Sequence, residues 1–224
     1  MQRDSIHVVQ RGGESALATN KVLKNTYMLL GLTFLFSALM AYIGVATNAP
    51  PLHFGILIVG FWGLMYLTER FKDSPLGLVF VFAFTGFIGF SVAPMLSFYM
   101  AHYSNGGQLV TTALAGTGII FFALSAYALT TRKDFSYMGG FLLVGGVLLM
   151  LGVIANLFFQ MPAIQLGLSA LFILFSSSVI LYQTSLIIHG GERNYISATL
   201  TIFVSLYNIF VSLLQILGAF GGED

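Results

Sequence analysis

Seven long apolar segments make up most of this chain, and they constrain its fold more than any other feature. A transmembrane helix needs about 20 predominantly apolar residues to cross a bilayer. With 57% hydrophobic and only 8% charged residues, the chain lies outside the usual composition of a water-soluble domain. The sequence therefore predicts an all-α membrane protein with lipid as its surroundings, whose seven transmembrane helices lie at about 26–46, 52–69, 76–100, 108–130, 136–158, 164–188 and 197–219.

The distribution of lysine and arginine predicts how the helices are oriented. Basic residues are retained on the cytoplasmic side of a membrane. Here they occur only in residues 1–25 and in the second, fourth and sixth loops. This alternation fits seven spans, and it predicts a cytoplasmic N-terminal tail (1–25), a membrane domain (26–219) and a short C-terminus on the far side (220–224). The polar composition of the tail predicts disorder. The basic residues are Arg3, Arg11, Lys21, Lys24, Arg70, Lys72, Arg132, Lys133 and Arg193.

Side chains suited to catalysis do not form a recognisable motif. Cysteine is absent, and the four histidines are scattered over four separate segments, at the edges of the spans or outside them. The sequence contains neither the HExxH pair of zinc proteases nor a phosphate-binding Gly-Lys-Thr loop. Nine basic residues, balanced by eight acidic ones, form no patch for nucleic acid. We therefore expect no catalytic residue, no cofactor, no metal and no nucleic-acid partner, and we do not expect an enzyme.

Polar side chains in the last span follow a single stripe. Thr201, Ser205, Asn208, Ser212 and Gln215 are spaced by four, three, four and three residues, which places them on one face of a helix. Because polar groups are costly in hydrocarbon, this face is predicted to point into the bundle. Candidate partners in the two preceding spans are Asn156, Ser169, Ser176 and Gln183.

This polar seam has two interpretations. It could form a path for an ion or a proton, or it could supply interhelical hydrogen bonds that assemble the bundle. No ionisable side chain lies in the middle of a span, since Glu69 is at a helix edge. That absence counts against a proton relay or a cation site.

Glycines within the spans, among them Gly86 and Gly89, predict close approach of neighbouring helices.

Several motifs resemble the Bax inhibitor-1 (TMBIM) family. The resemblance covers essentially the whole chain and is closest to the bacterial branch that modulates the FtsH protease. It implies a bundle in which six helices surround the last one. The motifs are Asn25-Thr26-Tyr27, Ala83-Phe84-Thr85-Gly86-Phe87, Ser125-Ala126-Tyr127, Leu129-Thr130-Thr131-Arg132-Lys133-Asp134, Ile187-Ile188-His189-Gly190-Gly191-Glu192-Arg193-Asn194-Tyr195-Ile196 and Val204-Ser205-Leu206-Tyr207-Asn208-Ile209-Phe210.

The resemblance implies two functions. In the bacterial branch, the protein is an inner-membrane substrate of an FtsH-type protease. It is engaged by its cytoplasmic tail and degraded slowly, so that it restrains proteolysis during membrane protein quality control, and its C-terminus is periplasmic. In other branches, the family leaks calcium through a pH-sensitive pair of aspartates on the last two helices. The matching positions here are Gln183 and Ser205, which offer no carboxylate to a cation. An ion leak is therefore the alternative.

The loop before the last span has a functional and a structural interpretation. It comprises His189, Gly190, Gly191, Glu192 and Arg193. As a functional element, this cytoplasmic turn would contact the protease or gate the bundle. As a structural element, the glycines supply turn conformations, the arginine fixes topology and the glutamate favours the start of the next helix.

Overall fold

The computed structural model describes residues 2–221, with side chains from residue 19 onward, and the described residues form seven helices without a strand. Each helix is long and apolar enough to cross a membrane, so the predicted fold class is confirmed. Of the predicted C-terminal segment 220–224, residues 222–224 lie outside the described residues. The helices are α1 (Gln2–Ala46), α2 (Phe54–Phe71), α3 (Pro75–His102), α4 (Gly106–Thr131), α5 (Met138–Phe159), α6 (Pro162–Ile188) and α7 (Tyr195–Gly221).

Local turn chemistry sets most of the helix ends. Pro75 and Pro162 begin α3 and α6, because proline fits the first helical turn, where its missing N–H is not needed. Arg132 and Gln160 end α4 and α5 in the left-handed conformation, with φ of 48° at both. Gly190 has a φ of 77° after α6, a conformation that glycine adopts without strain.

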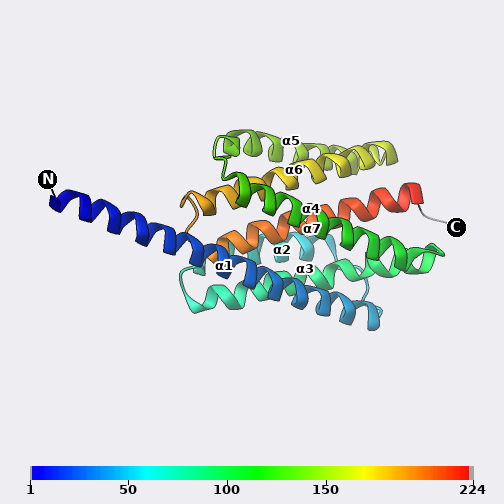
Figure 1. The fold of residues 1–224 in the computed structure, drawn as a ribbon. Coiled ribbons are helices and arrows are strands. Elements are labelled where there is room, and N and C mark those ends of the chain that lie inside the picture. Colours follow the sequence, from blue (N-terminus) through cyan, green and yellow to red (C-terminus); the bar gives the residue numbers. More distant parts are fainter. Residues whose placement is uncertain (1, 222–224) are drawn as a thin grey trace.

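The N-terminal leader differs from the prediction. Helix α1 begins at Gln2, whereas the sequence predicted a disordered tail before residue 26. Extending an existing helix fixes one residue for each hydrogen bond gained, so propagation is far easier than nucleation. The membrane-spanning part of α1, Thr19–Ala46, provides the nucleus for this extension. Figure 1 shows the start of α1 projecting well beyond the rest of the bundle.

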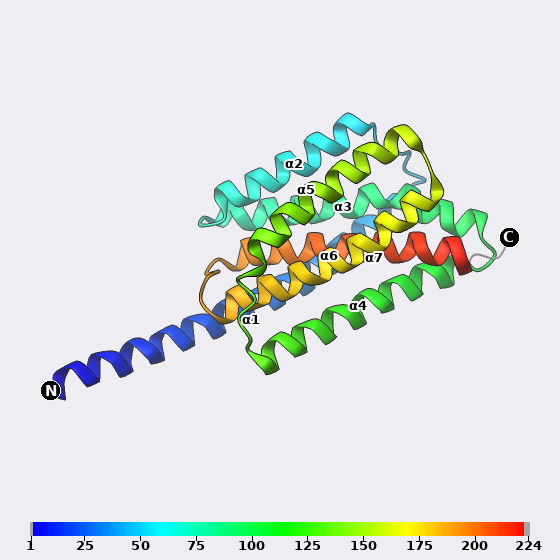
Figure 2. The same ribbon diagram turned by 90° about the horizontal axis from the view of Figure 1, so that it is seen from above.

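Helix α7 lies at the centre of the bundle. It packs against α1, α2, α3, α4 and α6, and half of its most apolar stretch is buried. The prediction of a central last helix is confirmed, with one difference in detail. Among the described helices, α5 packs its backbone against α6 alone. Figure 1 shows α5 at the upper margin of the bundle beside α6, and Figure 2, seen from above, shows it lying across the outer face of the bundle. Five helices therefore pack directly against α7, whereas α5 packs against α6.

The closest helix packing joins α1 and α3. A Cβ atom added to Gly89 would collide with the backbone carbonyl oxygen of Ser37, and one added to Gly86 would come within 2.6 Å of the Phe36 ring. Without a hydrophobic drive between helices in lipid, such small residues allow the backbone contacts that hold a bundle together. The predicted role of these two glycines is confirmed.

Candidate functional site

A polar cavity lies between α5, α6 and α7. Its volume is about 370 Å³, which leaves room for several water molecules. Asn208 stands at the midpoint of α7, so the cavity extends from the middle of the bundle toward the end where α7 finishes. A smaller cavity of about 180 Å³ shares Gln165 and Gln215 and continues to Gly218. The polar residues that line the larger cavity are Asn156, Gln165, Ser169, Asn208, Ser212 and Gln215.

One hydrogen bond joins α6 to α7 across this cavity. The Ser169 hydroxyl lies 2.7 Å from the Gln215 side-chain oxygen and 2.9 Å from the Gln165 backbone oxygen. A hydroxyl has a single proton to donate, so it can serve only one of these acceptors fully at a time. On α5, the Asn156 side-chain oxygen is buried and has no hydrogen-bond partner among the described residues. The cavity wall therefore retains polar capacity that water or a small polar ligand can satisfy.

The other half of the predicted seam lies outside the cavity. Ser205 donates to the backbone oxygen of Thr201 on its own helix, at 2.9 Å. Ser176 and Gln183 are buried on α6, and their Oγ and Nε2 atoms have no partner among the described residues. Buried polar atoms without partners also occur on α1 and α4 in Thr26, Tyr27 and Ser125, and in Thr184 of α6.

The structure thus divides the seam into two parts. Asn156, Asn208, Ser212 and Gln215 line the cavity together with Ser169, whereas Ser176, Gln183, Thr201 and Ser205 do not. Gln165 was not predicted, although its position one turn before Ser169 on the same helix face was a usable signal. The polar lining consists of amides and hydroxyls without a charged group. Such a lining can hydrogen-bond neutral solutes and water, but it cannot take up or release a proton near neutral pH.

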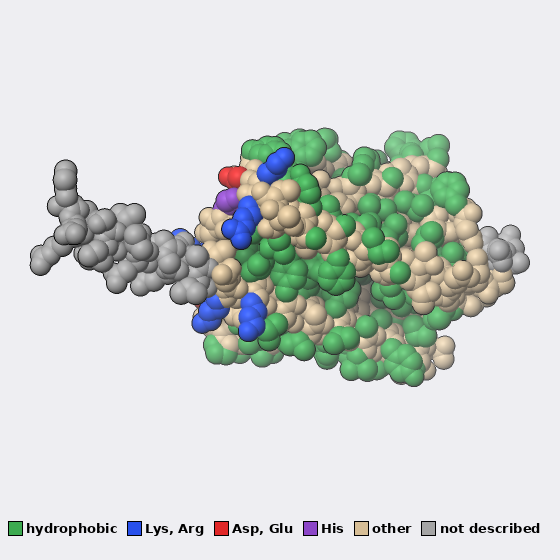
Figure 3. Space-filling model, viewed as in Figure 1, with side chains coloured by type: hydrophobic (Ala, Val, Ile, Leu, Met, Phe, Trp, Pro, Cys, Tyr) green, Lys and Arg blue, Asp and Glu red, His purple; other side chains and the backbone are tan. Residues whose placement is uncertain are grey.

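Charged side chains gather at the opposite end of the molecule. The described lysines and arginines lie at the start of the α1 span or at the ends of α2, α4 and α6, and Figure 3 shows them grouped at one end of the face in view. Below we call this the charged end. At the end of α2, Lys72 and Glu69 form an ion pair at 3.0 Å, and that hydrogen bond raises the pKa of Lys72.

His189 connects α6 to the loop between α4 and α5. Its Nδ1 lies 2.9 Å from the Ser185 backbone oxygen, and its Nε2 lies 3.1 Å from the Arg132 backbone oxygen at the end of α4. The Ser185 hydroxyl also accepts the Phe135 backbone N–H, at 2.9 Å. Both side chains therefore hold the loop that enters α5.

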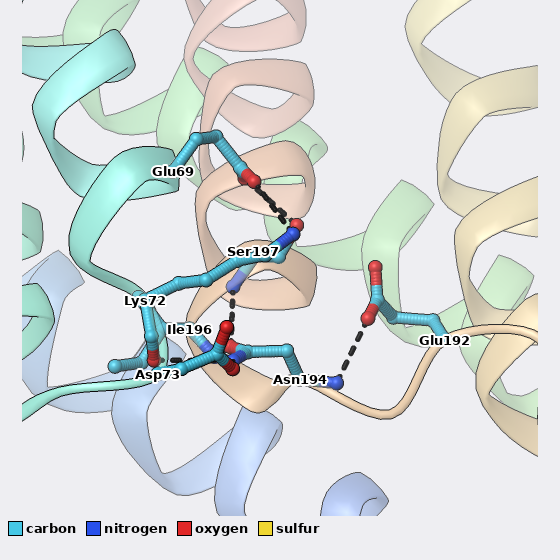
Figure 4. A network of polar contacts seen from close by, with 7 residues as sticks. All are labelled: Glu69, Lys72, Asp73, Glu192, Asn194, Ile196 and Ser197. Carbon is cyan, nitrogen blue, oxygen red and sulfur yellow. Dashed lines mark hydrogen bonds and ion pairs between the residues drawn. The ribbon is translucent and has the colours of Figure 1, made fainter.

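Asn194 connects the start of α7 to the α2–α3 loop (Figure 4). Its side-chain oxygen accepts the backbone N–H groups of Ile196 and Ser197, at 2.9 and 3.2 Å, as an N-cap does. Its side-chain nitrogen donates to Asp73 Oδ1 at 2.8 Å and to the Lys72 backbone oxygen at 3.1 Å.

Two carboxylates complete this network, which Figure 4 shows from close by. Ser197 donates its hydroxyl to Glu69 Oε1 at 2.7 Å, which joins α7 to α2. Glu192 Oε1 accepts the Asn194 backbone N–H at 2.8 Å and so fixes the turn before α7. Arg193 donates to the Gly190 backbone oxygen at 3.3 Å.

These contacts favour the structural interpretation of residues 189–193. Gly190 adopts the left-handed conformation, while Gly191 does not. The side-chain cap of α7 is Asn194, whose oxygen lies next to the first turn. Glu192, which was expected to favour the start of this helix, accepts the Asn194 backbone N–H. Ser185 and Ser197 were also not singled out from sequence, since each is recognised only through a contact with a distant loop.

Most of the chain matches a known protein family. Residues 19–222 match the family described as "Inhibitor of apoptosis-promoting Bax1". The chain belongs to this Bax inhibitor-1 family of multi-pass membrane proteins, and the resemblance noted in the sequence is confirmed.

The relatives extend over nearly the full length of the chain. The "Modulator of FtsH protease YccA" of Escherichia coli is 50% identical over 210 residues, which is 94% of each chain. An uncharacterised protein of Pseudomonas aeruginosa is 51% identical over 91% of each chain. An uncharacterised membrane protein of Vibrio cholerae is 39% identical over 94% of this chain and 95% of its own. The YccA-like bacterial branch is therefore the part of the family that this chain resembles.

Proposed function

We propose that this protein modulates an FtsH-type ATP-dependent protease in the bacterial inner membrane. It does so without catalysis of its own, by presenting its N-terminal segment (residues 1–25) to the protease as a slowly degraded substrate. The domain of residues 26–219 anchors it, and segment 220–224 ends on the periplasmic side. The supporting comparison is the 50% identity to the E. coli FtsH modulator along 94% of each chain.

The structural observation that carries this proposal is the projecting start of α1 (Figure 1). From Gln2 to the start of the membrane span at Thr19, a helix rises by about 26 Å. A processive protease needs an accessible terminal segment that it can grip and unwind. Because this projection extends from the charged end, retention of basic residues on the cytoplasmic side puts it where a cytoplasmic ATPase would act.

The test measures the half-life of an FtsH membrane substrate by pulse–chase in cells expressing the intact chain or one of two variants. In the first variant, residues 2–18 are replaced by a Gly/Ser sequence of equal length. In the second, the leader is intact and Gln183→Leu is combined with Ser205→Ala. We expect the intact chain and the second variant to prolong the half-life, and the first variant to lose the effect. An unchanged half-life with the intact chain contradicts the proposal.

The proposed orientation has its own test, because the chain contains no cysteine. Lys133→Cys places a thiol at the charged end, and Gln108→Cys places one at the opposite end. In intact spheroplasts, a membrane-impermeant maleimide should label the thiol at position 108 and leave the thiol at position 133 unlabelled. Labelling in the reverse pattern contradicts the cytoplasmic placement of the N-terminus.

An ion leak is the second candidate function, and the polar cavity is the observation that favours it. The cavity reaches Asn208 at the middle of α7, so one half of a pathway is present. Beyond it, Ile180, Phe203 and Leu206 are buried in an apolar cluster, and none of the described residues that line the cavity is charged. Calcium flux into liposomes containing the purified chain tests this function, and flux indistinguishable from that of empty liposomes excludes it.

A further inference from the structure

A groove runs between α1 and α4 on the outside of the bundle. Both helices pack against α7, but among the described residues their backbones do not contact each other. Two cavities of about 360 and 500 Å³ lie between them, and both are lined by Phe34 of α1 and Leu114 of α4. We call this continuous surface the α1–α4 groove. Its floor is formed by α7, through Phe203, Leu206 and Phe210.

The cavities of the groove are open and mostly apolar, so a thin apolar chain can enter them. A transmembrane helix with its side chains is about 10–12 Å in diameter, and a single acyl chain is much narrower. Two glycines, Gly31 on α1 and Gly118 on α4, line the cavity nearer the charged end, and a Cβ atom added to either would meet no atom within 4 Å. The groove therefore has free space for an acyl chain beside both glycines.

Basic side chains lie at one end of the groove. Lys24 continues the stripe of α1 residues that lines the groove. The stripe has a helical spacing of three, four, three and four residues through Lys24, Tyr27, Gly31, Phe34 and Ala38. The Lys24 side chain is exposed. From Lys24 to Phe34, the helix rises about 15 Å, which is half the thickness of a bilayer core. This half of the groove matches the depth of one lipid leaflet.

A second cation lies where α4 ends. Arg132 is exposed and follows Thr131, the last residue of α4, 14 residues and therefore about four turns after Gly118. Its backbone oxygen lies within hydrogen-bond distance of His189 Nε2. Its guanidinium group makes no hydrogen bond or ion pair with the described residues. The nearest acidic residue along the chain, Asp134, accepts the Ser136 backbone N–H at 2.8 Å. Each of the two helices that border the groove therefore has an exposed basic residue at the charged end.

From these observations we propose that the α1–α4 groove binds one acyl chain of an anionic phospholipid, whose phosphate is held at the charged end by Lys24 and Arg132. Basic sites between transmembrane helices attract anionic headgroups, and the apolar groove supplies the surface for the chain. A zwitterionic lipid of the same chain length lacks the net charge and binds more weakly. This inference is independent of protease modulation, because it uses only residues from position 24 onward.

The test is native mass spectrometry of the delipidated full-length chain, titrated with dioleoyl phosphatidylglycerol or dioleoyl phosphatidylcholine. We expect tighter binding of phosphatidylglycerol. Lys24→Gln should weaken it by about fivefold, which corresponds to about 1 kcal/mol, whereas Arg70→Gln, a charge change at the end of α2, should not. Gly31→Leu and Gly118→Leu should remove the preferential binding, because their side chains fill the groove.

The matched control for the groove variants is Gly140→Leu on α5, where an added Cβ atom also meets no neighbour. This variant should bind phosphatidylglycerol as the parent does. Equal affinity for the two lipids in the parent, or unchanged binding in Gly31→Leu, overturns the proposal. A dimer mass that is present in the parent and lost in Gly31→Leu would also overturn it, since the groove would then be a contact between two copies of this chain.

Discussion

Helices α5 and α7 show that apolar character and burial are separate properties in a membrane protein. By mean hydropathy, α5 is the most apolar of the seven spans, yet only 11% of its most apolar stretch is buried, compared with 50% for α7. Because lipid tails are as apolar as leucine, lipid-facing surface loses nothing by staying exposed. Polar and small residues need a protein environment instead, and they are what draw α7 into the centre.

The largest expected contrast is between the water accessibility of two serine positions on α7. It tests whether α7 is accessible to water only on the side that faces α5. Ser212 lines the cavity between α5 and α7, whereas Ser205 hydrogen-bonds within its own helix. In this cysteine-free chain, Ser212→Cys should react readily with a small, water-soluble thiol reagent. Ser205→Cys should stay unreactive in the folded protein and react only after unfolding in detergent. Equal reactivity of the two thiols would mean that the cavity does not divide the seam.

Core truncation should separate the two helices by stability. Ile209 on α7 is fully buried, whereas Leu148 on α5 is 62% exposed. Ile209→Ala leaves a void in the packed centre and should lower the free energy of unfolding by about 2–4 kcal/mol. Leu148→Ala only shortens a side chain that faces lipid, so it should change the free energy of unfolding by less than about 0.5 kcal/mol. Reversible unfolding in mixed micelles measures both, and similar losses would show that α5 is as firmly packed as α7.

The starts of the two helices also differ. Asn194 caps α7 through two backbone N–H groups, while Tyr137 at the start of α5 makes no side-chain cap bond. Asn194→Ala should therefore lower the free energy of unfolding by about 1–2 kcal/mol, the usual cost of losing an N-cap. Tyr137→Ala is the matched variant and should have a much smaller effect. If both variants cost the same, the network at the start of α7 adds nothing to its stability.

The smallest expected effect is a pH dependence at the entry to α5. Hydrogen bonding from Ser136 holds the pKa of Asp134 below its usual value. A carboxyl group whose pKa is lowered in the folded state stabilises that state above its unfolded pKa, and the contribution is lost as pH falls through the folded pKa. Thermal unfolding between pH 5 and pH 3 should therefore show a slightly smaller loss of stability for Asp134→Asn than for the parent. An identical pH profile would show that this bond is too exposed to contribute.

Several features were predictable because they depend on neighbours along the chain. The seven spans follow from runs of apolar residues, and the predicted bounds of the second to seventh spans agree with α2–α7 within two residues at each end. The stripe from Thr201 to Gln215 follows from helical periodicity. Both glycines of the turn before α7, Gly190 and Gly191, were expected to supply turn conformations, and a positive φ is found at Gly190.

Other features could not be read from the sequence because they depend on contacts between distant segments. The polar residues of α7 recur at regular spacing from Thr201 to Gln215. Only the C-terminal half of this stripe lines a cavity, because the backbone of α5 does not pack against α7. Asn194 looked like one turn residue among several until its contacts with Lys72 and Asp73 were visible. The leader continues as a helix because the membrane-spanning part of α1 nucleates it.

Hydropathy and charge act residue by residue on membrane insertion, so the seven apolar spans and the position of the basic residues at one end follow from the amino-acid sequence. Tertiary contacts set three further features: α5 lies outside the helices that pack around α7, half of the seam lines a cavity, and α1 and α4 leave a groove between them. In a bilayer, an apolar side chain is as stable against lipid tails as against protein. The helix arrangement is therefore set by close packing at small residues and by polar contacts between segments far apart in the chain.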